Sequence, residues 1–528
     1  MNDHLSYLAA RAGVGKMSRR EFIGRAGALG IGAAMANTMF AQAVQAAGPM
    51  KGGTIRAGIQ GASTTDSLDP ATTTNTAMTM VSRLWGEPLV VLAPHGGLDP
   101  KVAESYEASA DAKTWTFTIR SGITFSNGKT VTAEDVLATL ERHSGEETKS
   151  GALGLLRDIK SMRAEGDQFI IELEQANADL PYLMADYHLI IQPNGGKDDP
   201  SAAIGTGPYV LKEVDMGVRF VAEKNPDYWD ADLGHAAEIE VIVINDSTAR
   251  VAALQSGQVD MIDRVPPRTA GLVDRAPNIS VRSAAGSGHY VFIMHCNTAP
   301  FDNNDLRLAL KYGINRKELV DKILFGYGTI GNDTPINASY PLYSELEQRE
   351  YDPDKAKFHF EKSGFDGSVL LRTSDNSFPG APDAAALFQQ SLASAGINLE
   401  IKREPNDGYW SEVWNKQPFC TSYWSGRPIQ DQMYSTAYLS TADWNDTRFS
   451  NETFDQLLVA ARGELDEAKR TQMYADLGTI VRDEGGLICP MFNDFIGATS
   501  DRVAGWVEDH KGFDLMDLYA PMKMWVAA

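Results

Sequence analysis

Short segments in which apolar and polar residues alternate are spread along the chain. Thr114–Arg120 and Val218–Lys224 follow a two-residue period, which is typical of strands with one buried face. Ile239–Ile244 is a nearly continuous apolar run, as expected for a strand covered on both faces. The chain therefore contains half-buried and fully buried strands.

Other segments repeat their apolar positions at the spacing of a helix. Residues 304–312 and 315–325 each place leucine or isoleucine four residues apart, which predicts amphipathic helices. Thr132-Ala133-Glu134-Asp135 is a capping box that opens a helix over 136–143. A strand, a helix and a second strand follow one another over 369–403, which is a β-α-β unit. Together these segments predict an α/β fold.

The segment Ile204–Asp230 predicts a hairpin that opens on a tight turn. In Gly205-Thr206-Gly207-Pro208-Tyr209, two glycines free of φ restriction and a φ-locked proline favour a sharp turn before a strand. Met216-Gly217 marks the turn between the strands, and Asn225-Pro226-Asp227-Tyr228-Trp229 ends the second strand. Because the glycines lead into a strand and not a helix, a dinucleotide-binding loop is excluded.

This hairpin resembles the signature of the peptide/nickel-type bacterial extracellular solute-binding proteins, family 5, which serve ABC importers. Residues 119–136, IRSGITFSNGKTVTAEDV, resemble a second motif of the family, and the resemblance covers residues 52–520. It implies an α/β, two-lobed periplasmic-binding-protein fold, type II-like and of cluster C, with an extra inserted domain. The implied parts are lobe I over 47–75, 203–288 and 495–528, the inserted domain over 76–202, and lobe II over 289–494. The lobes are expected to exchange strands near 287–291 and 490–497.

The first 46 residues predict a twin-arginine signal peptide. Met17-Ser18-Arg19-Arg20-Glu21-Phe22-Ile23 matches the twin-arginine pattern, and a weakly apolar stretch follows over 26–40. Ala41-Gln42-Ala43 or Val44-Gln45-Ala46 offers small residues for cleavage. No cysteine precedes Cys296, so a lipobox is absent. We expect a soluble periplasmic protein without a lipid anchor.

The charge of the chain narrows the classes of partner. The 528 residues include 48 basic and 70 acidic side chains, a formal net charge of −22. Such acidity argues against binding to nucleic acid and against a basic membrane-binding surface. The length suffices for two or three domains.

Sequence patterns of catalysis are missing. The chain has no G-x-S-x-G, Walker A, H-E-x-x-H or C-x-x-C motif. His289 and His295 are six residues apart, about 20 Å along a strand, which is too far to share an ion. Cys296, Cys420 and Cys489 lie in apolar runs and are expected to be buried thiols, although one disulfide remains open. We expect no enzyme activity, no metal site and no cofactor.

The candidate ligand-binding loop is Thr421–Pro428. In the family, this strand end and loop face the cleft, and peptide-binding members carry an aspartate that pairs with the ligand's α-amino group. Aligned on Trp424, that position is Arg427, which suits a carboxylate, phosphate or sulfate instead. Two interpretations stay open: Arg427 contacts an anionic group of the solute, or it pairs internally with Asp431 or another carboxylate.

Aromatic and polar residues complete the predicted ligand site. Aromatic rings offer flat apolar area with a polar edge, which suits varied solutes. The predicted ligand-binding residues are Trp424, Arg427, Tyr423, Ser425, Gly426, Trp444, Asn445, Trp410 and, more weakly across the cleft, Ser63 and Thr64.

These features predict the solute receptor of an ABC importer. It captures an oligopeptide, an opine-like compound or another anionic peptide-like solute by closure of two lobes and delivers it to the permease. Its partners are the solute, the permease subunits and, indirectly, the ATPase subunits, with a monomer expected. The alternatives are a non-transport receptor or chaperone, and a twin-arginine-exported enzyme.

Overall fold

The computed structural model describes most of the chain. The described residues are 2–13, 17, 19–32, 35–36, 39–40, 43, 48–93, 97–145, 147–405, 409–507 and 513–527. Helices α1 (Asn2–Gly13) and α2 (Arg19–Ala28) lie within the segment predicted to be a signal peptide. Ser18 and both predicted cleavage motifs, apart from Ala43, lie outside the described residues. Within the described ranges, no helix combines the length and the apolar character needed to span a bilayer.

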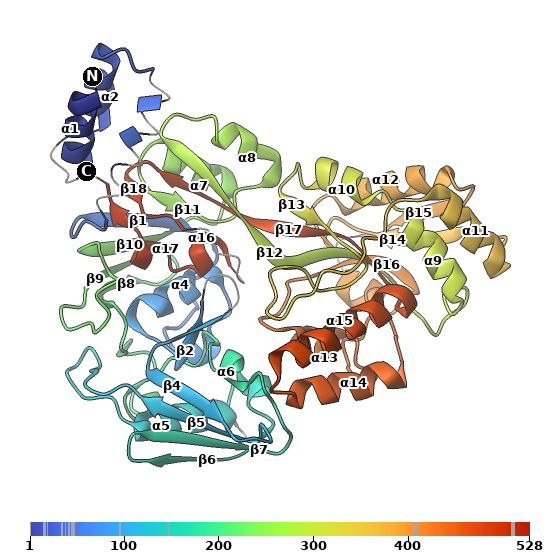
Figure 1. The fold of residues 1–528 in the computed structure, drawn as a ribbon, viewed down its shortest axis with the longest axis horizontal. Coiled ribbons are helices and arrows are strands. Elements are labelled where there is room, and N and C mark those ends of the chain that lie inside the picture. Colours follow the sequence, from blue (N-terminus) through green and yellow to red (C-terminus); the bar gives the residue numbers. More distant parts are fainter. Residues whose placement is uncertain are drawn as a thin grey trace.

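Two long strands join the two lobes of the molecule (Figure 1). They are β12 (Ile279–Met294) and β17 (Leu487–Ser500), which pair antiparallel and run from one lobe into the other. The register shifts between Ala285 and His289, so the ladder is interrupted where the strands pass between the lobes. Both strands are longer than the segments expected from the sequence. The two-lobed α/β fold is confirmed.

Lobe I is built on one end of this sheet. Its strands follow β17 in the order β11-β1-β10-β9-β8. Helix α4 (Thr76–Trp85) is buried along its whole length in the core of this lobe. The strands are β1 (Thr54–Ile59), β8 (Tyr209–Asp215), β9 (Arg219–Lys224), β10 (Glu238–Val243) and β11 (Met261–Ile262). The remaining elements are η1 (Pro70–Thr72), α7 (Ser247–Gln255), α8 (Pro267–Val273), β18 (Val503–Ala504), α16 (Asp514–Asp517), α17 (Ala520–Lys523) and β19 (Trp525–Val526).

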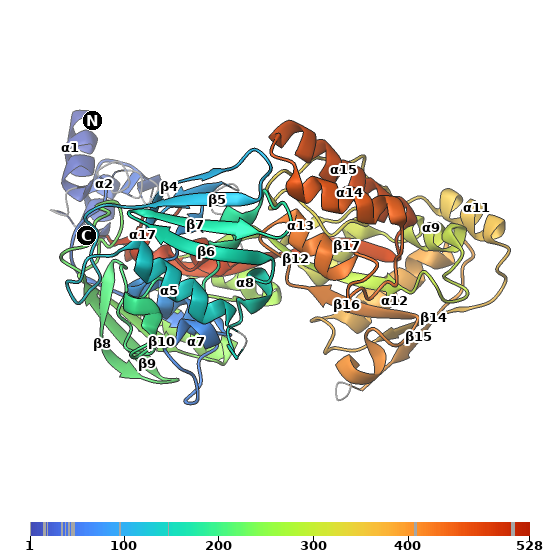
Figure 2. The same cartoon turned by 90° about the horizontal axis from the view of Figure 1, so that it is seen from below.

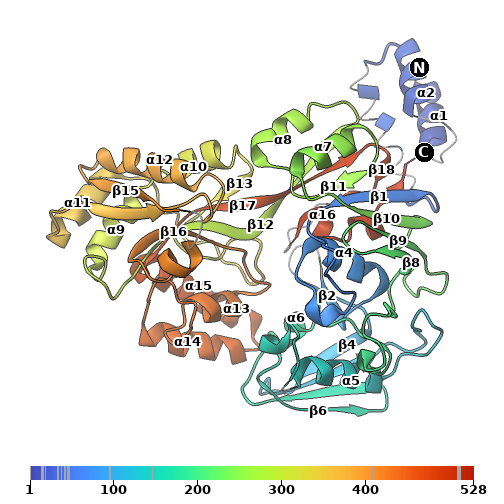
Figure 3. The same ribbon diagram turned by 180° about the vertical axis from the view of Figure 1, so that it is seen from behind.

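Lobe II covers the other end of the sheet with helices on both faces (Figure 3). Alternate residues of β12 explain this arrangement, since Phe292 and Met294 enter one core while Val291 and Ile293 enter the other. The first face carries α9 (Asn304–Tyr312), α10 (Arg316–Ile323), α11 (Pro353–Ser363) and α12 (Ala381–Ala393), and the second carries α13 (Gln430–Ala437), α14 (Glu452–Gly463) and α15 (Glu467–Glu484). The strands are β13 (Gly328–Ile330), β14 (Val369–Thr373), β15 (Leu399–Arg403) and β16 (Phe419–Trp424), with the π-helical turn η5 (Tyr409–Val413) before β16. The predicted β-α-β unit is confirmed, because β14 and β15 are parallel and flank α12.

A separate four-stranded sheet forms the inserted unit, which lies below lobe I in Figure 1 and faces the viewer in Figure 2. Its order is β4-β5-β7-β6, and it has its own core around Trp115, Phe117 and Phe169. The Thr132 capping box is confirmed, with Asp135 as its partner. The elements are β2 (Val90–Leu92), β3 (Leu98–Pro100), β4 (Ala103–Ala108), β5 (Thr114–Ile119), α5 (Ala133–Ser144), η3 (Leu153–Leu155), β6 (Ile159–Glu165), β7 (Gln168–Leu173), α6 (Leu180–Leu183) and η4 (Pro193–Gly196). The residue boundaries given above for the lobes stay a prediction.

The family motifs of the hairpin converge on one buried carboxylate, Glu87. Thr206 and Trp229 donate hydrogen bonds to its Oε2 at 3.0 and 3.1 Å, and the Tyr228 hydroxyl donates to Oε1 at 2.6 Å. Burial raises the pKa of Glu87. A Cβ on Gly207 would lie 2.5 Å from the backbone carbon of Trp85. Close packing against α4 therefore requires this glycine, whereas the sequence had suggested φ freedom as the reason.

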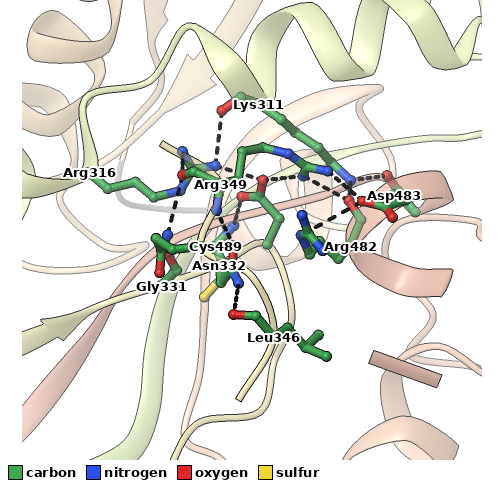
Figure 4. Close-up of polar contacts among 12 residues, drawn as sticks. Lys311, Arg316, Gly331, Asn332, Leu346, Arg349, Arg482, Asp483 and Cys489 are labelled. Carbon is green, nitrogen blue, oxygen red and sulfur yellow. Dashed lines mark hydrogen bonds and ion pairs between the residues drawn. The ribbon is translucent and has the colours of Figure 1, made fainter. Parts of the chain in front are cut away.

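A second buried polar network surrounds the C-terminal end of α15 (Figure 4). Lys311 donates to the carbonyls of Arg482 and Gly485 at 2.7 and 2.8 Å. Arg349 donates to the Arg482 carbonyl at 2.9 Å and, together with Arg316, to Asp333. The last carbonyls of a helix have no partner inside the helix, and cations there also complement its dipole. Burial lowers the pKa of Lys311 to about 7.

Candidate functional site

A cavity of about 580 Å³ lies between the lobes. From one side it is lined by Arg83 of α4, by residues 182, 183 and 185–188, and by Phe513 and Asp517. From the other side it is lined by Ser287 of β12 and by the loop 425–428 that follows β16. A pocket of this size, shared by two lobes, is typical of a small-molecule site.

The loop after β16 is fixed against β12 by a glycine and a tyrosine. Gly426 has φ +80°, and a Cβ on it would lie 2.2 Å from the Ser287 Oγ, so only glycine fits without displacement. The backbone N–H of Arg427 donates to the Tyr340 hydroxyl at 3.1 Å. The backbone of Arg427 is therefore fixed by the packing of Gly426 on Ser287 and by the hydrogen bond to Tyr340, and its side chain lines the cavity.

Arg427 has no carboxylate partner among the residues that the structure describes. Its Nη1 donates to the Gly426 carbonyl at 2.6 Å, and its Cζ lies 5.7 Å from the centre of the Trp424 ring. Desolvation by burial lowers the pKa of Arg427. Asp431 is bound instead by the Nε of Arg462, at 3.1 Å to each carboxylate oxygen. The internal pairing of Arg427 with Asp431 is therefore wrong.

The other charged side chains of the cavity are paired. Arg83 binds Asp517 at 3.0 Å. His188 places Nδ1 2.6 Å from an oxygen of Asp186 and Nε2 2.9 Å from the carbonyl of Thr73. Arg427 is therefore the charged side chain of this cavity for which the described residues supply no carboxylate partner.

The structure brings only part of the predicted ligand site to this cavity. Ser425, Gly426 and Arg427 line it. Trp424 is 4% exposed and packs in the core of lobe II. Asn445 is also buried, and its amide donates to the carbonyls of Leu439 and Phe449. These two side chains are therefore held within lobe II, and a solute contact for either stays a prediction.

Tyr423, Trp410 and Trp444 lie outside the lining of this cavity. They are 47%, 36% and 53% exposed. Trp410 contacts Tyr423 edge-on at 5.5 Å between ring centres, and Trp444 contacts Trp424 at 6.1 Å. The three exposed rings thus form an aromatic surface on lobe II.

Ser63 and Thr64 also lie outside the lining of the cavity. Their backbone passes the hairpin turn at Gly217, where a Cβ would lie 2.6 Å from the Ser63 carbon and the Thr64 nitrogen. The loop does approach a smaller cavity, of about 280 Å³, through Gly61. This second cavity shares Tyr187 and Phe513 with the larger one.

Sequence reasoning missed the wall opposite Arg427. Arg83, Asp186 and His188 belong to no motif, and tertiary packing alone brings them to the cavity. Ser287 carried a detectable pattern, because it stands between Gly286 and Gly288 in the middle of a strand. Glycines inside a strand often mark a bulge or a close backbone approach.

Histidines and cysteines form no metal centre in the described part of the chain. No group of three or more histidine, cysteine or acidic side chains with metal-binding geometry occurs there. Burial lowers the pKa of His289 and of His295 to about 4, so both rings are neutral core groups. The three cysteines are free thiols, and Cys420 and Cys489 are buried.

Comparison with known proteins identifies the family. The model of the bacterial extracellular solute-binding proteins, family 5 (middle part), matches residues 97–446. The chain belongs to this family. The glutathione-binding protein GsiB of Salmonella typhi is 26% identical over 471 residues, which cover 85% of this chain and 92% of that protein.

Solved structures agree on the fold of this family 5 protein. HbpA2 from Haemophilus parasuis has a TM-score of 0.79 at 20% identity, covering 90% of this chain and 100% of the other. AgaA from A. tumefaciens R10, in complex with agropinic acid, has a TM-score of 0.71 at 23% identity, covering 90% and 99%. Similar structures include an ABC transporter substrate-binding protein and an ABC transporter-associated periplasmic binding protein. These structures share the fold of the chain, and the family match makes it a bacterial extracellular solute-binding protein.

Proposed function

We propose that this chain is the periplasmic receptor of an ABC importer for a small polar solute with an anionic group, such as an acidic peptide or an opine. The observation that supports the proposal is Arg427, which enters the cavity between the lobes without a carboxylate partner among the described residues. A charge-assisted hydrogen bond to an anion at this position contributes roughly 1.5–3 kcal/mol. A free ammonium group is the wrong partner for a guanidinium.

The similar proteins support an acidic or peptide-like solute. GsiB is a glutathione-binding protein, and the AgaA structure contains agropinic acid. Arg83 is paired with Asp517, whereas Arg427 has no carboxylate partner among the described residues. An anion bound at Arg427 neutralises the guanidinium within a partly desolvated site.

Capture occurs by closure of the two lobes about β12 and β17. In this proposal lobe I comprises 47–75, 203–288 and 495–528, the inserted domain 76–202, and lobe II 289–494. The first helix of the inserted domain, α4, packs in the core of lobe I. A solute shifts the equilibrium only if it binds the closed form more tightly than the open form. The closed form presents a surface to the permease subunits, which work with the ATPase subunits.

Export by the twin-arginine route brings the protein to the periplasm. The motif Met17–Ile23 and the small-residue cleavage motifs support removal of residues 1–46. The protein acts there as a monomeric receptor and not as an enzyme.

A ligand panel with a charge-reversed variant tests the proposal. Native mass spectrometry identifies any solute that copurifies, and thermal shifts are recorded with glutathione, agropinic acid, an acidic dipeptide and a neutral dipeptide. A solute at 100 times its Kd stabilises the protein by about 2.7 kcal/mol. Arg427→Asp abolishes the shift for the anionic solute, whereas Arg268→Asp, on the exposed side of α8, preserves it. Equal affinity of Arg427→Asp and the parent chain would refute the role of Arg427.

A further inference from the structure

The inserted unit touches lobe II on the side of the cavity away from β12 and β17. In Figure 1 the loop after β7 approaches the elbow between α14 and α15, while the two connecting strands run along the opposite side. The backbone N–H of Ala178 donates to the Arg462 carbonyl at 2.7 Å. A Cβ on Gly463 would lie 2.9 Å from the Cβ of Ala176. The loop and the elbow are therefore in direct backbone contact.

A buried ion pair crosses the same contact. Asp179 of the inserted unit lies 3.1 Å from the Nη1 of Arg470 in α15, and it accepts a hydrogen bond from the Tyr474 hydroxyl at 3.2 Å. All three residues are less than a tenth exposed. Arg470 and Tyr474 follow Asp179 by 291 and 295 residues in the sequence. The three side chains are therefore buried together only because the inserted unit contacts lobe II.

An apolar anchor accompanies the ion pair. Ile429 belongs to lobe II but is buried in the hydrophobic core of the inserted unit. It directly follows the loop 425–428 that lines the cavity. Through Ile429, the cavity loop is thus directly connected to the contact between the inserted unit and lobe II.

We propose that the loop 176–179 and the α14–α15 elbow form a latch that holds the lobes closed over the solute, with Asp179 and Arg470 as its charged pair. When the lobes separate, water solvates both charges. When they close, each charge is buried and depends on the other, because an unpaired buried charge is strongly destabilising. Asp179, Arg470 and Tyr474 are positioning residues that set the affinity for the solute without touching it. This inference rests on the lobe closure proposed above.

An engineered disulfide tests, without any ligand, whether the loop 176–179 contacts the α14–α15 elbow in solution. Disulfides need a Cβ–Cβ distance of about 3.8 Å, so Ala176→Cys and Gly463→Cys come into bonding distance after a shift of about 1 Å. We expect this double-cysteine chain to form an intramolecular disulfide in air-oxidised, solute-free protein, detected by mass and by mobility before and after reduction. The two single-cysteine chains are the controls for pairing with native thiols. Absence of the 176–463 disulfide would overturn the latch.

The rate of disulfide formation then tests the charged pair. Asp179→Ala or Arg470→Ala leaves one buried charge alone, so each slows the reaction by about tenfold or more. The double variant Asp179→Ala/Arg470→Ala removes both charges and recovers most of the parental rate, and Asp179→Glu recovers part of it. Asp230→Ala is the matched control, since it breaks the Lys101–Asp230 pair on the lobe I side. Circular dichroism verifies that every variant is folded.

The ligand panel and the rate of disulfide formation can fail independently, so they test the proposed solute class and the latch separately. Arg268→Asp in the double-cysteine chain leaves the rate in solute-free protein unchanged, because Arg268 lies on the exposed side of α8, away from the latch. The solute class is wrong, but the latch stands, if no anionic solute of the panel binds while the double variant Asp179→Ala/Arg470→Ala recovers the rate that the two single variants lose. If single and double variants all react at the parental rate, Asp179 and Arg470 do not hold the lobes together.

Discussion

Replacement of Glu87 tests whether the family motifs act as one unit. Glu87→Ala removes the acceptor of three buried donors, on Thr206, Tyr228 and Trp229. Each buried polar group left without a partner costs roughly 1–3 kcal/mol. The three donors are neighbours and share one carboxylate, so the losses overlap, and we expect the free energy of unfolding of lobe I to fall by about 3–5 kcal/mol.

Glu87→Gln provides the discriminating comparison. Burial raises the pKa of Glu87, so its charge is disfavoured in the folded protein and a neutral isostere avoids that penalty. The amide oxygen still accepts from two donors, and we expect a loss of about 1–2 kcal/mol. Tyr228→Phe removes a single bond and serves as the control.

Urea unfolding measures the free energy of unfolding, and hydrogen exchange of residues 205–229 measures the local stability of the hairpin. Glu87→Ala shifts the urea midpoint most and accelerates exchange throughout the hairpin. The reasoning fails if Glu87→Ala lies within 1 kcal/mol of the parent, or if the glutamine variant is as unstable as the alanine variant.

Two further predictions concern Lys311 and Gly426. Burial lowers the pKa of Lys311 to about 7 in the folded protein, whereas the unfolded chain keeps this proton up to its ordinary pKa. Above pH 7 the unfolded state therefore binds more protons than the folded state. The free energy of unfolding then rises with pH by up to about 1.4 kcal/mol per pH unit. Lys311→Met lacks this rise between pH 7 and 9 in denaturant titrations, and parallel pH slopes of the two proteins would contradict the assignment. Gly426→Ala places a Cβ against Ser287 at φ +80° and displaces the cavity loop, so the Kd for the solute found in the panel increases about tenfold or more by calorimetry. Gly364→Ala, also at positive φ but in open space, leaves the Kd unchanged, and equal Kd values for all three chains would argue against a fixed loop.

Local patterns predicted the elements whose neighbours are close in sequence. The β14-α12-β15 unit and the β8–β9 hairpin follow the periodicity of their own residues. The first half of β12 was missed, because its short alternating start is followed by the small residues Ser283–Gly288, which carry no strand pattern. Pairing with β17, more than 200 residues away, defines it as a strand.

The site shows the same division between local and distant information. Arg427 was found through its position relative to Trp424. The exposure of the aromatic residues was not predictable, since it depends on distant partners such as Asp446, whose buried carboxylate accepts the Trp414 indole N–H at 3.0 Å. The sequence also offered Asp431 as a partner for Arg427, but Arg462, on a different helix, occupies that carboxylate.

The central position of β17 constrains the order in which the protein can form during synthesis. In the sheet it lies between β11 of lobe I and β12, yet it follows both of them in the sequence, beginning only at Leu487. Until about residue 500 has emerged, β11 and β12 each present an unpaired edge, which is an aggregation hazard for a nascent chain. Neither lobe can be completed before β17 has been synthesised, and a chain truncated before Leu487 would leave both unfinished.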